Sequence, residues 1–337
     1  MKMKIAINGF GRIGRLTLRA ILENNNNNFE VVAINDLGDI NSNIHLFKYD
    51  SVHGTFKQDI KIIENIVEIN EKKISFYSEK DPISLPWNEL NVDLVIESTG
   101  FFTDRDSAYK HIEAGAKKVL ISAPGKNPDL TVVYGVNHNM ITSSHKIISN
   151  GSCTTNCLAP IAHILDNKLE IMSGYMTTVH SVTGDQKTID TFHKDLRRAR
   201  NSSISMIPTS TGAAKAVGEV LPNLIGKLDG SAIRVPTANV SLIDFTFQTK
   251  IETSSEKINN LLSEASKNEL KNILSVSKVP LVSCDFNHNS HSSIVDLNET
   301  KVINNIFCRI LSWYDNEWGF SNRLIDVANK MLDENDL

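Results

Sequence analysis

Cys153, in the segment NGSCTTNCLAP (residues 150–160), is the residue best suited to covalent chemistry. It follows a small hydroxyl residue and precedes an apolar stretch with helical spacing. A cysteine at the start of a helix faces unpaired N–H groups and the positive end of the helix dipole, which favour the nucleophilic thiolate. Cys157 lies one helical turn later, where we expect a small buried side chain. Cys153 is therefore a candidate nucleophile.

A disulfide, a redox pair or a metal ligand is the alternative role for such a cysteine. The chain has only four cysteines in 337 residues, which does not indicate a disulfide framework. A tetrahedral zinc site needs a second close pair or clustered histidines, and neither accompanies Cys153 and Cys157. We expect reduced thiols and no metal site.

His180, in MTTVHSVTGDQ (residues 176–186), is the candidate partner of this thiol. It stands at the end of a predicted strand, where an imidazole can act as general base and pair with a thiolate. The chain has ten histidines, and spacing alone does not bring His180 to Cys153. A structural role for His180 stays open at this point.

The segment KIAINGFGRIGR (residues 4–15) contains a G-x-G-x-x-G pattern between a predicted strand and a predicted helix. Gly9 permits a tight turn, Gly11 lets the backbone approach a pyrophosphate, and Gly14 lets the helix pack closely on the strand. The first amides of the helix, those of Arg12 and Ile13, would face the anion. The pattern predicts a dinucleotide site.

Asp36 follows the next strand-like run, VVAIN, and lies 22 residues after Gly14. A carboxylate at this point accepts hydrogen bonds from the adenosine ribose and repels a 2′-phosphate. The alternative is a carboxylate that only caps a turn. The strand–loop–helix–strand context favours cofactor binding and NAD.

The first 150 residues alternate apolar runs with helical stretches, which predicts an α/β fold with a Rossmann-type doubly wound sheet. The polar run Asn24–Asn28 reads as an exposed loop without function. The expected strands are Lys4–Asn8, Val31–Asn35, Val92–Glu97, Lys118–Ser122 and Lys146–Ser149, and the expected helices include Arg12–Glu23 and Asp104–Ala114.

Residues 151–316 show longer strand-like runs, which predict a second, catalytic domain with a mixed, largely antiparallel α+β sheet. We expect a C-terminal helix within residues 317–337 to pack back on the first domain, with apolar spacing clearest over Glu317–Met331. The expected elements between are strands within Ala232–Lys250 and Ile306–Tyr314 and helices at Thr211–Leu221 and Ser255–Lys267.

The charge balance is nearly neutral, with 35 basic and 39 acidic residues and a net charge of −4. This gives no general reason to expect a nucleic-acid partner or a membrane surface. No secretory signal is recognisable at the start, and no run approaches the roughly 18 apolar residues of a membrane span. We expect a cytoplasmic protein.

These residues and several longer segments together resemble the phosphorylating glyceraldehyde-3-phosphate dehydrogenase family. The resemblance spans nearly the whole chain and implies a cytoplasmic homotetramer of glycolysis that uses NAD, glyceraldehyde 3-phosphate and inorganic phosphate. The segments that carry it are INGFGRIGR, INDL, ESTGFF, SCTTNCLAP, HKDLRRAR, PTSTGAAKAVG, RVPTANVS and WYDNEWGFSNR.

The resemblance also implies roles for individual residues. Cys153 would attack the aldehyde carbon, His180 would activate it, and Asn316 would orient the nicotinamide. Lys80 and Ser122 match more peripheral cofactor positions. The residues implied for one anion site are Thr183, Asp185, Arg198 and Arg234, and those for the other are Ser152, Thr154, Thr211 and Gly212. Taken singly, Thr183 and Thr211 are better explained as caps, Asp185 as a turn acid and Arg234 as a surface charge, and only the resemblance favours the anion sites.

Cofactor choice is less clearly indicated than the chemistry. Asp36 followed by Leu37 resembles the members that prefer NAD, whereas TGDQ (residues 183–186) resembles photosynthetic members that accept NADP. Thr191 and Phe192 replace a pair, often Leu-Pro or Gly-Pro, that crowds a 2′-phosphate in strictly NAD-dependent members. We expect NAD to be preferred, with weaker use of NADP.

Two other functions are alternatives to this one. Erythrose-4-phosphate dehydrogenase shares the Cys–His pair but releases the acyl group to water, whereas PTSTG (residues 208–212) favours phosphate as the acceptor. An RNA-binding protein could use the dinucleotide cleft with the basic run HKDLRRAR, which the resemblance instead places in an S-shaped loop at a subunit interface. We expect no dedicated nucleic-acid partner.

Overall fold

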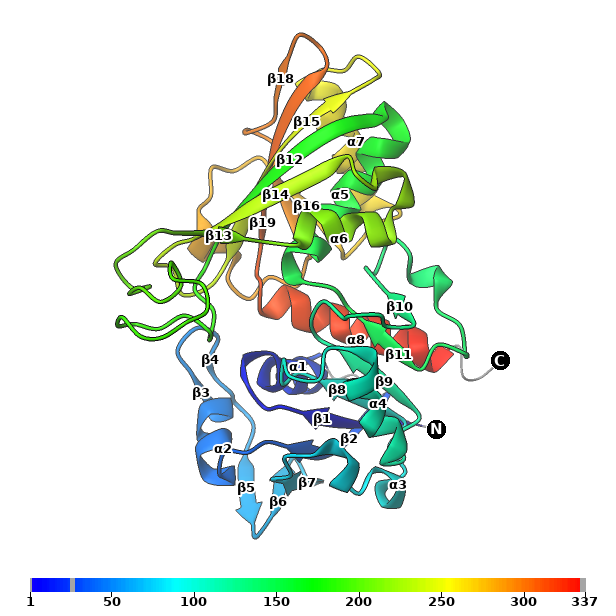
Figure 1. Ribbon diagram of the computed structural model, residues 1–337, viewed down its shortest axis with the longest axis vertical. Helices are drawn as coiled ribbons and strands as arrows, with labels where there is room; N and C mark the ends of the chain where they lie inside the picture. The colour runs from blue at the N-terminus through cyan, green and yellow to red at the C-terminus, as the bar shows by residue number, and fades with distance from the viewer. Residues whose placement is uncertain (1, 25–27, 334–337) are drawn as a thin grey trace. The chain divides into compact units, whose positions relative to one another are not determined.

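The computed structural model describes residues 2–24 and 28–333 and divides the chain into two compact units (Figure 1). Unit 1 comprises residues 1–132, 138–151 and 321–337, and unit 2 comprises residues 133–137 and 152–320. The expected boundaries at residues 150 and 316 differ from this division in three places, because Gly151 belongs to unit 1 and residues 133–137 and 317–320 belong to unit 2. Part of the expected loop Asn24–Asn28 and the last four residues of the expected terminal helix lie outside the described residues.

Unit 1 is built on a nine-stranded sheet in the order β10-β11-β9-β8-β1-β2-β7-β6-β5. Pairing is parallel from β10 to β7, and β7-β6-β5 forms an antiparallel ribbon that the sequence reading did not predict. The strands are β1 (Met3–Asn8), β2 (Phe29–Asn35), β5 (Ile60–Ile63), β6 (Ile66–Ile69), β7 (Lys72–Tyr77), β8 (Leu94–Glu97), β9 (Lys118–Ile121), β10 (Leu130–Thr131) and β11 (Ile147–Ser149).

The central strands β8, β9 and β11 are buried along their whole length, as strands covered on both faces must be. The Rossmann-type doubly wound sheet is confirmed, and all five predicted strands are present with ends shifted by at most two residues. The helices and short strands of unit 1 are α1 (Arg12–Glu23), α2 (Ile40–Lys48), α3 (Trp87–Leu90), α4 (Arg105–Glu113), β3 (Tyr49–Asp50) and β4 (Gly54–Thr55).

Unit 2 contains a mixed sheet in the order β13-β14-β12-β15-β19-β17-β16, with β18 paired to β19. Five of its seven strand pairs are antiparallel, as expected, and the β12/β14 and β16/β17 pairs are parallel. The strands are β12 (Ile171–His180), β13 (Ile207–Ser210), β14 (Leu228–Arg234), β15 (Ser241–Thr249), β16 (Leu274–Ser277), β17 (Ser293–Asp296), β18 (Lys301–Ile303) and β19 (Phe307–Tyr314).

The apolar core of unit 2 lies between this sheet and its helices, with side chains such as Leu158, Val217, Phe245 and Ile258. The strand-like run Ala232–Lys250 is two strands, because the chain turns at residues 235–240, where Val240 adopts a positive φ of 68°. The helices are α5 (Cys153–Leu169), α6 (Ala213–Val220), α7 (Ser255–Lys267) and α8 (Trp318–Asp333), of which α8 begins in unit 2 and continues in unit 1.

Within residues 2–24 and 28–333, no helix is both long and apolar enough to cross a membrane. Over the same residues, no group of three or more His, Cys, Asp or Glu side chains is arranged to hold a metal ion.

Candidate active site

Cys153 is the first residue of α5, in unit 2. The helix begins there because Ser152 caps it, its hydroxyl accepting the N–H of Thr155 at 3.0 Å. The thiol is half-buried, and its Sγ lies 3.6 Å from Nε2 of His180. The structure therefore brings together the two residues that spacing alone could not join.

His180 owes its position to the parallel pairing of β12 with β14, which places it opposite Arg234. Its Nδ1 lies 2.8 Å from the carbonyl oxygen of Ser181 and 2.6 Å from Nη1 of Arg234. The guanidinium of Arg234 can only donate, so its contact with Nδ1 competes with that of Ser181. In the tautomer in which Nδ1 carries the ring proton and donates it to Ser181, Nε2 is left to accept a proton from the thiol of Cys153. This is the arrangement of a nucleophile and its general base.

Electrostatics in the site keep both partners neutral. Burial and, after it, the positive charge of Arg234 lower the pKa of His180 to about 3. Burial raises the pKa of the Cys153 thiol, although the charge of Arg234 and hydrogen bonds from Thr154 oppose the shift. The sequence led us to expect a thiolate at the helix start, and this expectation is wrong. Desolvation raises the pKa of the sulfur by more than the N–H groups of the helix start lower it. Attack by sulfur must be coupled to transfer of its proton to His180.

Tyr314, which the sequence reading overlooked, fixes the first turn of α5. Its hydroxyl lies 2.8 Å from Oγ1 of Thr154 and 2.9 Å from Oγ1 of Thr178, and all three side chains are buried. The hydroxyl of Thr154 is thus engaged inside the protein. The backbone N–H of Thr154, and not its hydroxyl, therefore remains for the expected anion site.

We predict that Tyr314→Phe lowers the free energy of unfolding by about 1–3 kcal/mol, because it leaves the buried hydroxyls of Thr154 and Thr178 without their partner. Urea denaturation followed by circular dichroism measures this change. Tyr175→Phe is the matched control, since Tyr175 is half exposed on β12, and it should change stability by less than about 0.5 kcal/mol. Equal stability of the two variants would contradict the prediction.

The residues expected for the first anion site fall into two groups. Arg234 lies beside His180. Asp185 accepts hydrogen bonds from the hydroxyl of Thr183 and from Nη1 of Arg198, the latter at 2.9 Å. The charges of Asp185 and Arg198 shift the pKa of His180 in opposite directions, which indicates that this pair lies near the catalytic residues.

The residues expected for the second anion site gather at two helix starts. Ser152 caps α5, and Gly212 stands immediately before α6. The hydroxyl of Thr211 accepts the N–H of Ala213 at 3.2 Å, and the hydroxyl of Thr155 donates to the carbonyl of Ala213 at 3.4 Å. The amino-terminal ends of α5 and α6 therefore meet, and their dipoles favour an anion.

Asn316 is held in the turn between β19 and α8. Its Oδ1 accepts hydrogen bonds from the hydroxyls of Ser181 at 2.9 Å and Ser241 at 2.8 Å. The neighbouring carboxylate of Asp315 accepts the N–H groups of Trp318 and His288, each at 2.7 Å. Since Ser181 directly follows His180, the same strand end positions the base and the Asn316 amide.

The glycine loop of unit 1 has the conformation that its sequence predicts. Gly9 has a φ of +90°, and a Cβ there would lie 2.6 Å from the backbone nitrogen of Thr99. A Cβ on Gly14 would lie 2.1 Å from the carbonyl oxygen of Gly9. No atom lies within 4 Å of the corresponding point at Gly11, where α1 begins with the amides of Arg12 and Ile13. Space for a pyrophosphate and the amides of a helix start thus occur together.

Asp36 stands one residue past the end of β2. Its Oδ2 accepts the N–H of Phe10 at 2.7 Å, and its Oδ1 accepts the N–H of Gly38 at 2.8 Å. The carboxylate is therefore fixed beside the glycine loop. Lys80 is exposed in the loop after β7, and Ser122 follows β9 and is half-buried.

Two family models match the chain. Residues 3–105 match "Glyceraldehyde 3-phosphate dehydrogenase, NAD binding domain", and residues 152–316 match "Glyceraldehyde 3-phosphate dehydrogenase, C-terminal domain". The chain belongs to the glyceraldehyde-3-phosphate dehydrogenase family. The two matched segments contain the glycine loop and the Cys153–His180 pair, respectively.

Named members of the family are similar to this chain over almost its whole length. The glyceraldehyde-3-phosphate dehydrogenase of Xanthobacter flavus is 56% identical over 331 residues, which covers 98% of this chain and 99% of that protein. Those of Zymomonas mobilis and Cereibacter sphaeroides are 54% and 51% identical, with the same shares of each chain covered.

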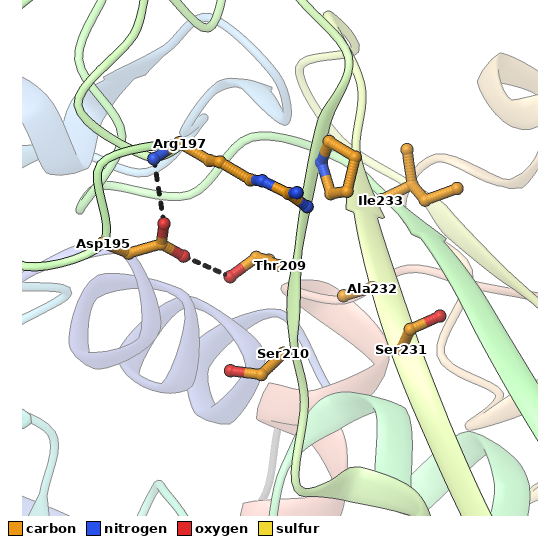
Figure 2. Close-up of a pocket in the computed structure, with 8 residues that line it drawn as sticks. Asp195, Arg197, Thr209, Ser210, Ser231, Ala232 and Ile233 are labelled. Atoms are coloured by element: carbon orange, nitrogen blue, oxygen red, sulfur yellow. Dashed lines mark hydrogen bonds between the residues drawn. The ribbon is translucent and has the colours of Figure 1, made fainter.

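Unit 2 also carries a surface pocket of about 440 Å³ (Figure 2). It is lined by β13, β14 and the segment around Asp195, whose carboxylate accepts the hydroxyl of Thr209 at 2.7 Å and the N–H of Arg197 at 2.9 Å. Cys153 and His180 do not line it. The pocket is therefore not the place where family chemistry occurs.

Sequence reasoning missed the residues that orient the functional groups: Tyr314, Asp315, Ser181 and Ser241. Asp315 had a readable signal, because an aspartate just before a helical pattern is typical of a helix start. The others had none, since their partners are distant in sequence.

Proposed function

We propose that this oxidoreductase converts glyceraldehyde 3-phosphate, inorganic phosphate and NAD to 1,3-bisphosphoglycerate and NADH. Membership of the family and its NAD-binding domain support this activity. The single observation that carries the chemistry is the 3.6 Å separation of the Cys153 sulfur and Nε2 of His180, with Arg234 on the other side of the ring. That geometry suits attack on an aldehyde by a cysteine.

In this mechanism His180 transfers a proton in each of three successive steps. It takes the thiol proton as sulfur bonds to the aldehyde carbon, and passes it to the carbonyl oxygen to give a hemithioacetal. It takes the hydroxyl proton back as the carbon loses a hydride and becomes a thioester. It returns the proton to sulfur when phosphate displaces the thioester, and the proton of the attacking hydrogen phosphate is released to solvent. The low pKa of His180 keeps Nε2 unprotonated and ready for the first step.

Bound NAD supplies the hydride acceptor. The residues present fit that cofactor, because the open space at Gly11, the amides of Arg12 and Ile13 and the fixed carboxylate of Asp36 suit a pyrophosphate and a ribose. We propose that Asn316 holds the nicotinamide carboxamide. In this proposal Gly9 and Gly14 shape the loop, and Lys80 and Ser122 contact the cofactor at its periphery.

The two anionic groups require two sites. We propose that Arg234, Thr183 and Arg198 bind one phosphate, with Asp185 positioning Arg198. The starts of α5 and α6 would bind the other, through Ser152, Thr211, Gly212 and the N–H of Thr154. A guanidinium and helix amides are strong phosphate donors, which supports this assignment.

The experiment that tests the function follows NADH formation from glyceraldehyde 3-phosphate, with and without inorganic phosphate. Turnover that requires phosphate supports the proposal. Turnover indifferent to phosphate would mean that water accepts the acyl group, as in erythrose-4-phosphate dehydrogenase. The comparisons with known proteins favour the main proposal over this alternative and over RNA binding.

We predict that kcat/KM is at least about tenfold higher with NAD than with NADP, because the carboxylate of Asp36 repels a 2′-phosphate. Steady-state kinetics with both cofactors measure the ratio. Asp36→Asn removes the charge and should move the ratio toward NADP, while kcat with NAD changes less than KM. Equal efficiency of the unaltered protein with both cofactors would overturn the prediction.

We also propose that the protein is a cytoplasmic homotetramer. The segment of residues 189–206 carries apolar side chains that are at least 71% exposed, namely Ile189, Phe192, Leu196, Ile204 and Met206. Such a concentration is typical of an interface between subunits. Light scattering after size-exclusion chromatography tests this proposal, and a monomeric mass would contradict it.

A further inference from the structure

Three neighbouring strands of unit 1 end in buried polar side chains. Asn8 ends β1, Asn35 ends β2 and Glu97 ends β8, and the parallel pairing places Asn8 opposite both of the others (Figure 1). None of the three is more than 4% exposed. Burying polar groups is costly unless each one is hydrogen-bonded, so their partners are informative.

Glu97 is connected to α4 through His111, and through His111 to Trp87 of α3. The indole Nε1 of Trp87 lies 3.0 Å from Nδ1 of His111, and Nε2 of His111 lies 3.1 Å from Oε2 of Glu97. An indole N–H can only donate, so Nδ1 must accept, which puts the ring proton on Nε2. His111 therefore donates to Glu97. Trp87 and His111 are completely buried.

Glu97 also accepts hydrogen bonds from residues at the start of the loops that leave the sheet. Its Oε2 also accepts the amide of Asn8 at 2.6 Å, and its Oε1 accepts the N–H of Thr99 at 2.8 Å. The carboxylate thus fixes both the residue before Gly9 and the residue after Ser98.

The same hydrogen-bond network includes a third loop, at Glu79, and the glycine turn at Gly9. Asn8 accepts from the amide of Asn35 at 2.7 Å, and Asn35 accepts the N–H of Glu79 at 2.8 Å. The hydroxyl of Ser98 donates to the carbonyl of Gly9 at 2.7 Å. These loops lie at the carboxyl ends of parallel strands, where doubly wound sheets bind their ligands.

We propose that His111 is a positioning residue for the dinucleotide site. By donating to Glu97 from α4, it holds the Gly9 turn and Thr99 at the spacing that the cofactor requires. It touches neither the cofactor nor the reacting atoms. The inference rests on the proposed binding of NAD and adds a residue that acts through Glu97.

Nε2 of His111 also lies 3.3 Å from Nδ2 of Asn8, so two substitutions separate the contact with Trp87 from the contacts with Glu97 and Asn8. In His111→Gln the side-chain amide reaches the Glu97 carboxylate but loses the contact with Trp87. In His111→Asn the shorter amide accepts from Trp87 but does not reach Glu97. Both variants replace a buried ring with a smaller polar group, so each is the other's control for packing loss.

The test measures the dissociation constant for NAD by calorimetry and the KM values for both substrates, with thermal unfolding alongside. We expect His111→Asn to weaken NAD binding about tenfold, the contribution of roughly one hydrogen bond to a charged group, and His111→Gln to bind NAD nearly as the unaltered protein does. KM for glyceraldehyde 3-phosphate should not change in either. NAD affinities that are equal in the two variants, or that follow their melting temperatures, would overturn the proposal.

A second variant covers the case in which His111→Asn does not fold. Glu97→Gln keeps the side-chain shape, but an amide cannot accept at both ends, so it must break the link to Asn8 and His111 or the link to Thr99. Weaker NAD binding by a folded Glu97→Gln supports the inference, and unchanged binding contradicts it. If the unaltered protein itself fails to bind NAD, the proposed function fails instead.

Discussion

Cys153→Ser is expected to reduce kcat for NADH formation by at least about 10⁴-fold, because a serine hydroxyl beside a neutral imidazole is a far weaker nucleophile than sulfur. The substitution removes one polarisable atom and leaves the cap of α5 in place, so folding should be preserved. Unit 1 holds the glycine loop, and NAD binding measured by calorimetry should therefore stay within about twofold of the unaltered protein. Stopped assays with glyceraldehyde 3-phosphate, phosphate and NAD measure the loss.

Cys284→Ser is the matched control for this prediction. Cys284 is exposed, whereas Cys157 is fully buried with a pKa raised by burial to about 12. Full activity of Cys284→Ser together with the loss in Cys153→Ser would assign the chemistry to one sulfur. Residual activity of Cys153→Ser above about one per cent would mean that another group attacks the aldehyde.

His180→Asn is expected to lower kcat by about 10²- to 10⁴-fold, the usual contribution of a general base. Asparagine keeps an amide that donates to Ser181 but offers no proton acceptor at the position of Nε2. KM for NAD should change little, since the glycine loop belongs to unit 1 and His180 to unit 2. His145→Asn, on a surface turn of unit 1, is the control and should retain full kcat. Full activity of His180→Asn would exclude the proposed proton transfers.

The low pKa of His180 also predicts how stability depends on pH. The folded pKa is about 3, against an ordinary value of 6.5. Between these values the unfolded chain binds a proton that the folded protein does not. The free energy of unfolding therefore falls as the pH is lowered from about 6.5 toward 3.

In His180→Asn this contribution should vanish, so its stability should fall less steeply over the same pH interval. Urea denaturation of both proteins at pH 7 and pH 4.5 measures the difference. Parallel pH profiles for the two proteins would show that the imidazole is protonated in the folded state as easily as in the unfolded chain.

Local sequence patterns predicted helices and strands well where one short segment determines the backbone conformation. Gly9, Gly11 and Gly14 specify their strand–turn–helix because each needs its own backbone conformation or space, whatever the rest of the chain does. The run Ala232–Lys250 was harder to read, because apolar spacing continues through the turn at residues 235–240 that separates β14 from β15. The strand β5 was missed because its isoleucines are largely exposed and show no alternation, and β6 was missed although its four side chains alternate between half-buried and buried.

The candidate site could be read only in part, because contacts distant in sequence decide it. Cys153 was recognisable from its place before a helix, but its meeting with His180 depends on how β12 pairs within the sheet. Thr154 and Tyr314 are 160 positions apart, and no local pattern links them. The direction of the Cys153 pKa shift was wrong because burial, a property of the whole fold, exceeds the effect of the helix start.

The interleaving of the two units bears on how the chain folds as it is synthesised. Residues 133–137 belong to the core of unit 2, where Gly135 packs closely against Ile273 and Leu270. Unit 1 is completed only by residues after 320, where Asn322 bonds to Asn24 at 2.9 Å. The ribosome therefore releases most of the nucleotide-binding half long before its last helix exists. The nucleotide-binding half therefore stays incompletely packed until unit 2 has been synthesised. A fragment that ends at residue 151 would lack the last helix permanently.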